Sequence, residues 1–299
     1  MSHAPAAAVR PRLAGAAQLA TDYLTLTKPK VQSLLLATTV AAMYVAGDPS
    51  LELVALTCLG GYLSAGGAGA INHYWDRDID ARMSRTAGRP VAAGRISPRA
   101  ALGFGVVLAA ASFVELWLAV NLLAACLALA GFAGYVGVYT MWLKRATPQN
   151  IVIGGAAGAV PPLVGWAATE GSLGPAALFL FVIVFYWTPP HFWALSLLMR
   201  DEYAKVGVPM MPVVRGEHET RRQILLYSLL LYAVTQLPFC VGFFGAYYLA
   251  GSMALGVLFM AASLVLYRRA DRRSALRLYL YSLLYLALLF GAMVLDVKL

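Results

Sequence analysis

The sequence predicts an all-α polytopic membrane protein with nine transmembrane helices. Its 299 residues are 61% hydrophobic and 12% charged, whereas about a quarter of the residues are charged in an average soluble domain. Apolar stretches of about 17 to 25 residues, the length that a helix needs to cross the hydrocarbon core, recur along the chain. The short alternating segments typical of a transmembrane β-barrel do not appear in the sequence.

The expected helices are apolar stretches separated by charged or turn-forming residues. In chain order they are Val31–Ala46, Leu51–Trp75, Ala100–Val120, Leu122–Leu143, Ile151–Ala168, Ala176–Met199, Ile224–Leu249, Ser252–Tyr267 and Ala275–Leu295. Residues 1–27 contain no apolar run long enough for a signal peptide, and Pro11 interrupts them. We therefore expect a mobile cytoplasmic arm over residues 1–27 and a single membrane domain over residues 28–299.

The distribution of basic residues predicts the orientation. Lysines and arginines cluster before the first helix, after the second, fourth and sixth helices, and between the last two. The intervening loops are expected to carry Asp48, Glu52, Glu115 and Glu170 but no lysine or arginine. The positive-inside rule then places the N-terminus in the cytoplasm of a bacterial inner membrane and the C-terminus outside. The net charge of +9 follows mostly from this topology and implies no nucleic-acid partner.

Two cytoplasmic loops are longer than the others and hold most of the charged residues. They run over residues 76–99 and 200–222. At the start of the first loop, Asn72, Asp76 and Asp80 are spaced four apart, so on a continuous helix they share one face. Carboxylates beside hydrocarbon are costly unless they bind something. Two carboxylates and an amide form an all-oxygen site that suits Mg²⁺ with a phosphate in its coordination shell.

The arginines after this motif point to the same ligand. Arg82, Arg85 and Arg89 can bind phosphate oxygens bidentately, so the combination predicts a diphosphate site at a cavity mouth. The alternative is that these charges only anchor a helix end and pair with one another. The regular spacing, followed by "RTAGRP", favours the diphosphate site. Asp78 is expected on another face, as an ordinary interfacial charge.

The stretch "NHYWDRDIDARMSRTAGRP" resembles the N-x-x-x-D-x-x-x-D motif of the intramembrane aromatic prenyltransferase superfamily. "LTKPKV", "PQNIVIGGAAGAVPPLVGW", "WTPPHFWAL" and "GVPMMPVV" resemble its protoheme IX farnesyltransferase branch. The resemblance runs from about residue 25 to residue 220. It implies a central cavity that is open to lipid and capped on the cytoplasmic side.

The resemblance also implies the reaction. The substrates would be farnesyl diphosphate and haem b, the products haem O and diphosphate, and the cofactor Mg²⁺. A downstream haem A synthase or a terminal oxidase would be a partner. The second acidic motif of the superfamily is usually D-x-x-x-D, but here it reads Asp201 and Lys205, so a lysine suited to phosphate stands where a second metal ligand would be.

The residue assignments follow from these two lines of reasoning. Asn72, Asp76 and Asp80 are the expected metal and catalytic residues. The candidate diphosphate-binding residues are Arg82, Arg85, Arg89, Lys28, Lys144, Arg145 and Lys205. Tyr139 and Tyr203 either orient the pocket or are ordinary interfacial aromatics. For Arg77, Arg95 and Arg99, positive-inside topology is an equally good explanation.

A haem acceptor raises the question of histidine contacts. His191 follows two prolines and is expected about 13 Å inside the membrane. It either binds a backbone carbonyl freed by the proline kink or contacts the haem. His73 is the second candidate. Two alternative functions are a prenyltransferase for 4-hydroxybenzoate or a similar aromatic acceptor, and a transporter with helices broken at "GAVPPLVGW" and "YWTPPHFW".

Overall fold

The computed structural model describes residues 15–299, and every regular element in that range is helical. The elements are α1 (Ala16–Leu26), α2 (Pro29–Ala46), α3 (Leu51–Trp75), α4 (Arg77–Asp80), α5 (Pro98–Ala119), α6 (Leu122–Ala133), the π-helix η1 (Gly134–Leu143), α7 (Lys144–Ala146), α8 (Asn150–Gly158), α9 (Val160–Glu170), α10 (Pro175–Leu198), α11 (Arg200–Lys205), α12 (Met211–Val214), α13 (Gly216–Cys240), α14 (Ala246–Arg269) and α15 (Arg272–Lys298). The all-α prediction is confirmed.

Eight stretches of the described chain are long and apolar enough to cross a membrane. They are α3, α5, α6 through α7, α8 with α9, α10, α13, α14 and α15. The remaining predicted helix corresponds to α2, which has 18 residues but is less apolar because it carries Lys30, Gln32 and several hydroxyl side chains. The chain is therefore an integral membrane protein, with eight clear spans and α2 as the ninth long helix beside them.

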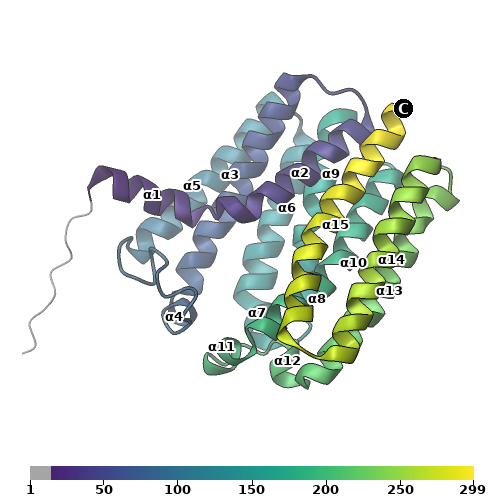
Figure 1. The fold of residues 1–299 in the computed structure, drawn as a ribbon. Coiled ribbons are helices and arrows are strands. Elements are labelled where there is room, and N and C mark those ends of the chain that lie inside the picture. The colour runs from purple at the N-terminus through teal and green to yellow at the C-terminus, as the bar shows by residue number, and fades with distance from the viewer. Residues whose placement is uncertain (1–14) are drawn as a thin grey trace, which may run out of the picture.

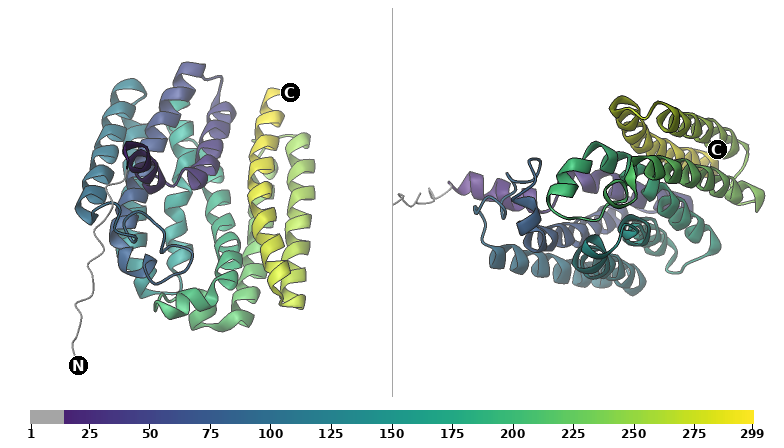
Figure 2. Two further views of the ribbon diagram at one scale, coloured as in Figure 1. Left: turned by 60° about the vertical axis from the view of Figure 1, so that its left-hand side comes forward. Right: turned by 90° about the horizontal axis from the view of Figure 1, so that it is seen from below.

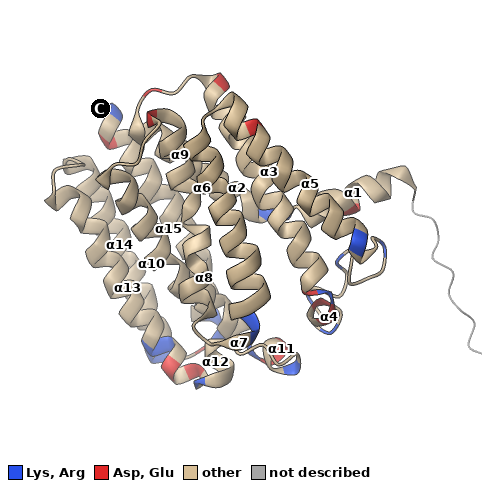
Figure 3. Ribbon diagram, turned by 180° about the vertical axis from the view of Figure 1, so that it is seen from behind, with Lys and Arg blue, Asp and Glu red and all other residues tan. Residues whose placement is uncertain are grey.

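The long helices lie side by side and close into a bundle (Figures 1 and 2). Helix α2 packs against α3, α9 and α15, while α10 packs against α13 and α15. The largest buried cluster lies around α10, α13, α14 and α15, where Trp193, Tyr248 and Tyr285 are fully buried. The short helices α4, α7, α11 and α12 gather at one end of the bundle, where many of the charged residues also lie (Figure 3). This charged end holds the candidate site.

Several expectations about individual elements are wrong. The seventh predicted helix does not continue to Leu249, because α13 ends at Cys240 and Gly242, with φ of 77°, makes the turn into α14. Most of the predicted loop over residues 200–222 is helical, in α11, α12 and the first turns of α13. Glu115 lies within α5 rather than in a loop, and both of its carboxylate oxygens are buried against the α3 face around Gly60.

The N-terminal segment and one of the two proline motifs also differ from expectation. We expected residues 1–27 to form a mobile arm, but Ala16–Leu26 forms α1, and residues 1–14 lie outside the described part. Helix α10 continues through Pro189 and Pro190, so only the "GAVPPLVGW" motif interrupts a helix, between α8 and α9. Continuous α10 removes half of the argument for a transporter with broken helices.

Candidate active site

Helix α3 ends where the first acidic motif begins. Its final carbonyls are bound by cations: Arg77 donates to the carbonyl of Tyr74 at 2.7 Å and Arg145 to that of Trp75 at 3.2 Å. Cations stabilise the C-terminal end of a helix because its last carbonyls have no partner within the helix. Asp76 is the C-cap of α3, so the motif is divided between α3 and the short α4.

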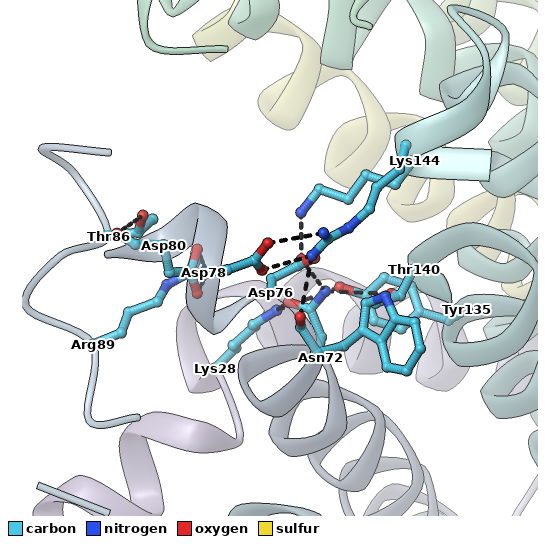
Figure 4. Close-up of polar contacts among 12 residues, drawn as sticks. Lys28, Asn72, Asp76, Asp78, Asp80, Thr86, Arg89, Tyr135, Thr140 and Lys144 are labelled. Carbon is cyan, nitrogen blue, oxygen red and sulfur yellow. Dashed lines mark hydrogen bonds and ion pairs between the residues drawn. The ribbon is translucent and has the colours of Figure 1, made fainter. Parts of the chain in front are cut away.

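Asn72 and Asp76 are brought together as the four-residue spacing indicated. The Asn72 Nδ2 donates to Asp76 Oδ2 at 2.7 Å, and the two residues are 4% and 0% exposed. Asp80 departs from the expectation of one continuous helix face. It lies on α4, where both of its carboxylate oxygens accept from Arg89 Nη1, at 2.8 and 2.7 Å. Figure 4 shows this pair apart from the group around Asp76.

Four of the predicted phosphate ligands surround these acids. Lys144 forms an ion pair with Asp76 Oδ2, and Arg145 lies 3.6 Å from Asp76 Oδ1. Arg145 also binds Asp78 with both terminal nitrogens, at 2.8 and 2.9 Å, so Asp78 is more than an interfacial charge. Lys28 Nζ donates to Asn72 Oδ1. With Arg89, four cations from three segments of the chain therefore meet at this motif (Figure 4).

Lys28 has an unusual backbone. Its φ of 54° lies in the left-handed region, which costs a non-glycine residue about 1–2 kcal/mol. Such strain persists where the surrounding structure fixes it, often at functional sites. The pKa of Lys28 falls to about 7 because the side chain is buried and because Arg89 and Lys144 repel its charge. An anion bound among these cations would raise that pKa again, since it favours the charged form.

The π-helix η1 supplies site residues that the sequence analysis did not assign. Thr140 Oγ1 accepts from Asn72 Nδ2 at 3.3 Å, and Tyr135 Oη lies 3.4 Å from Lys28 Nζ. Tyr139 packs on Tyr135 at 5.5 Å between ring centroids, and a Cβ on Gly154 would come within 2.4 Å of its ring. The sequence signal for this contribution was the four-residue spacing of Tyr135 and Tyr139, which places both rings on one helix face shortly before Lys144. The wider turns of a π-helix commonly occur at functional sites.

The second loop contacts the first but does not add a carboxylate to Asp76. Glu202 accepts from the backbone nitrogen of Ser84 at 2.7 Å and pairs with Lys205 at 2.9 Å. Asp201 is exposed, and Tyr203 is partly buried, which raises the pKa of its hydroxyl. The sequence analysis missed Glu202, which lies between the two residues of the motif. The two loops therefore meet through Glu202, while Lys205 pairs with Glu202 rather than with the first motif.

The other candidate arginines and the two candidate histidines differ in their burial and in their hydrogen-bond partners. Arg82 donates to the carbonyl of Asp78 at 3.2 Å, whereas Arg85 is exposed and pairs with no acid of the described chain. His73 is 2% exposed, and its Nδ1 has no hydrogen-bond partner among the described residues. His191 Nδ1 bonds the Ser282 hydroxyl at 2.7 Å rather than a carbonyl freed by the prolines.

His191 lies in an aromatic stack between α10 and α15. Its ring stacks on Trp187 at 4.3 Å and on Tyr279 at 4.9 Å. The indole nitrogen of Trp187 donates to the carbonyl of Ser282 at 2.8 Å. Trp187 and His191 are buried and Tyr279 is half-buried, and the stack belongs to different helices from the aspartate motif. The two candidate histidines therefore lie in separate environments.

The oxygen ligands around Asp76 are of the kind that bind a hard divalent cation. Asp76 Oδ1 is buried and accepts no hydrogen bond, although it lies among cations. Within the described part of the chain no three His, Cys, Asp or Glu side chains group closely enough to hold a metal by themselves. Asn72 and Asp76 therefore supply an incomplete oxygen shell, as is usual for Mg²⁺ that shares its coordination with a substrate phosphate.

The sequence model of the UbiA prenyltransferase family matches residues 34–289. The chain belongs to this family. A curated relative from Symbiobacterium thermophilum, named protoheme IX farnesyltransferase, is 56% identical over 284 residues, covering 94% of this chain and 95% of the relative. A relative of the same name from Roseiflexus sp. strain RS-1 is 55% identical, covering 95% of this chain and 54% of the relative. The chain spans about half the length of several such relatives.

Two solved structures share the fold of this chain. A digeranylgeranylglyceryl phosphate synthase superposes with a TM-score of 0.77 at 18% identity, covering 94% of this chain and all of that one. A UbiA homologue from Archaeoglobus fulgidus, bound to GPP and Mg²⁺, gives a TM-score of 0.68 at 19% identity, covering 91% of this chain and 99% of that one. Because the sequence identities are only 18% and 19%, these similarities establish the fold of the chain and nothing more.

Proposed function

We propose that this UbiA family member transfers a farnesyl group from farnesyl diphosphate to the vinyl group of haem b, with addition of water, and releases haem O and diphosphate. The observation that carries the proposal is Asp76, a fully buried carboxylate among Lys28, Lys144 and Arg145. An arrangement of buried acids and cations at the membrane surface suits an allylic diphosphate. The names of the close relatives support the acceptor.

The residues of the first motif would bind the donor. Asn72 and Asp76 would hold Mg²⁺, with Asp80 facing the same diphosphate from α4. When bound, Mg²⁺ would neutralise negative charge on the leaving diphosphate. Lys144, Arg145 and Arg89 already pair with the acids, and Lys28 donates to Asn72, so these cations can turn to the phosphate oxygens with little reorganisation.

The chemical step needs no nucleophilic side chain. The bond between C1 of the farnesyl group and the diphosphate oxygen breaks, and its electron pair leaves with the diphosphate. The vinyl π electrons of haem b form the new carbon–carbon bond to C1. Water then adds to the remaining cationic carbon and loses a proton. The task of this chain is to bind and orient both substrates and to stabilise the leaving group.

The acceptor would lie deeper in the bundle than the diphosphate. His191 is the proposed contact, because it is held in an aromatic stack that can pack against a flat macrocycle. His73, next to Asn72, is the second candidate. The haem O product would pass to a haem-modifying enzyme or a terminal oxidase in the same membrane.

The orientation is part of the proposal. The charged end that carries the site would face the cytoplasm, and Leu299 would lie outside. Single cysteines near Arg85 and Glu217 should react with a membrane-impermeant reagent from the cytoplasmic side, and those near Asp48 and Glu170 from the other side. Cytoplasmic labelling at Leu299 would contradict the nine-span topology.

The activity can be tested with purified protein. Incubation with Mg²⁺, farnesyl diphosphate and haem b should give a more hydrophobic haem, with the mass of one added farnesyl group and one added hydroxyl group. Reactions without donor, and reactions with 4-hydroxybenzoate in place of haem, serve as controls. Prenylated 4-hydroxybenzoate with unchanged haem would instead support the alternative acceptor class.

A further inference from the structure

The first helix contacts the active-site loop through a buried ion pair. Asp22 lies on α1 and is 1% exposed. Arg95 binds both of its carboxylate oxygens, with Nε at 3.1 and 2.9 Å and Nη2 at 3.0 Å. A carboxylate is rarely buried so completely unless its partner fixes it geometrically. Neither residue touches the acids of the motif.

Arg95 extends this contact towards the motif. Its Nη2 also donates to the carbonyl of Gly88 at 3.0 Å, and its backbone nitrogen bonds the carbonyl of Pro90 at 2.9 Å. Between these two anchored residues lies Arg89, which holds Asp80. Arg95 thus bonds the residues on both sides of Arg89 while it is paired with Asp22.

The same helix leads directly to Lys28. Leu26, the last residue of α1, and Thr27, its C-cap, pack against the glycines of α3: a Cβ on Gly69 would come within 2.8 Å of the Leu26 carbonyl oxygen. Gln32 donates to the Thr27 carbonyl at 2.5 Å. Docking of α1 and its linker thus fixes the chain just before the strained left-handed residue.

We infer that Asp22 and Arg95 are a positioning pair that docks α1 onto the active-site loop, so that Lys28 and Arg89 are presented to the diphosphate from two sides. The inference rests on the proposed function for the identity of the donor. It assigns a role in donor binding to α1, which the sequence places in an N-terminal arm. It also gives Arg95 a task beyond membrane topology.

Donor binding without turnover separates this role from the chemistry. Asp22→Asn removes the charge at nearly constant shape, and Arg95→Lys keeps a charge but loses the planar fork. Each should weaken binding of farnesyl thiodiphosphate, an unreactive donor analogue, by about tenfold, because small displacements of phosphate ligands are costly. Haem affinity should stay within about twofold of wild type, since His191 lies on other helices.

Matched controls distinguish positioning from stability. Glu219→Gln breaks an exposed ion pair with Arg222 at the same end of the bundle and should leave both affinities unchanged. Because Asp22 and Arg95 act through one contact, the Asp22→Asn/Arg95→Lys double variant should lose little more than either single variant. Asp22→Glu, which keeps the carboxylate, should bind farnesyl thiodiphosphate more tightly than Asp22→Asn but less tightly than wild type. Arg95 is partly exposed, so Arg95→Lys keeps the test available if Asp22→Asn fails to fold.

The outcomes separate the two proposals. Wild-type protein that fails to bind the donor analogue would contradict the proposed function itself. Wild-type protein that binds it, with folded Asp22→Asn and Arg95→Lys variants that bind equally well, would overturn only the positioning role. Equal losses of donor and haem affinity in both variants would also overturn it, because that pattern indicates a general loss of structure.

Discussion

The two acidic motifs at the charged end of the bundle are built differently. In the first, Asp76 and Asp80 are 0% and 3% exposed; Asp76 is paired with Lys144 of α7, and Asp80 with Arg89 of the same loop. In the second, Asp201 is exposed, and the Lys205 side chain is 65% exposed in a local pair with Glu202. Buried charges are costly unless they are well paired, whereas exposed pairs contribute little. This contrast supports the proposal that the first motif binds the donor, while the second motif contacts the first loop through Glu202 and Ser84.

The largest expected effect comes from the buried acid of the first motif. Asp76→Asn should lower kcat/KM by about 100-fold or more, because it removes a metal ligand and the partner of Lys144. Steady-state kinetics with farnesyl diphosphate and haem b would measure it. Asp48→Asn, at an exposed acid paired with Lys298, is the control. Near-normal activity of Asp76→Asn would remove the distinction between the two motifs.

A smaller and more selective effect is expected at the acceptor contact. His191→Ala should weaken haem binding about tenfold and leave binding of the donor analogue unchanged, because the stack is separate from the first motif. Spectroscopic titration with haem would measure it. His191→Gln and Ser282→Ala separate two explanations. If haem affinity falls in both His191→Gln and His191→Ala but not in Ser282→Ala, His191 contacts haem directly. If haem affinity also falls in Ser282→Ala, the His191–Ser282 hydrogen bond instead acts by holding α10 and α15 together.

The π-helix offers a test within the first motif. Thr140→Val keeps the shape of the side chain but removes the acceptor for Asn72 Nδ2. Donor KM should rise by about threefold to tenfold, the range expected for one buried hydrogen bond. Thr38→Val, whose hydroxyl bonds only within its own helix, is the control. An unchanged donor KM would show that η1 does not help to orient Asn72.

The smallest effect is expected in the second motif. Lys205→Ala removes an exposed side chain paired with Glu202, so donor KM should change by less than about threefold. Glu202→Gln should have a larger effect than Lys205→Ala, because Glu202 also holds Ser84 of the first loop. A loss with Lys205→Ala as large as that with Asp76→Asn would show that both motifs bind diphosphate directly.

The limits of prediction from sequence follow the same division. Helix periodicity was enough to place Asn72 and Asp76 on one face, because the contact is local. Helix periodicity did not predict the position of Asp80, because α3 ends at Trp75. There the Arg77 and Arg145 side chains donate hydrogen bonds to the last carbonyls of the helix. The spacing within a motif does not record such long-range contacts.

Contacts between distant segments could not be read from the sequence. The pairs Asp22–Arg95, Glu202–Ser84 and His191–Ser282 join residues that are 73, 118 and 91 positions apart. Each residue has an ordinary local explanation, such as topology for Arg95 or a proline kink for His191. Only the packing of α1, α11 and α15 against their neighbours shows which explanation applies.

The central claim is that the first motif binds a metal–diphosphate through Asp76. The most direct measurement is the affinity of farnesyl thiodiphosphate for wild-type and Asp76→Asn protein across a titration of Mg²⁺. The account predicts that Mg²⁺ tightens donor binding to wild-type protein and has little effect on folded Asp76→Asn protein. Equal enhancement by Mg²⁺ in both proteins would contradict it.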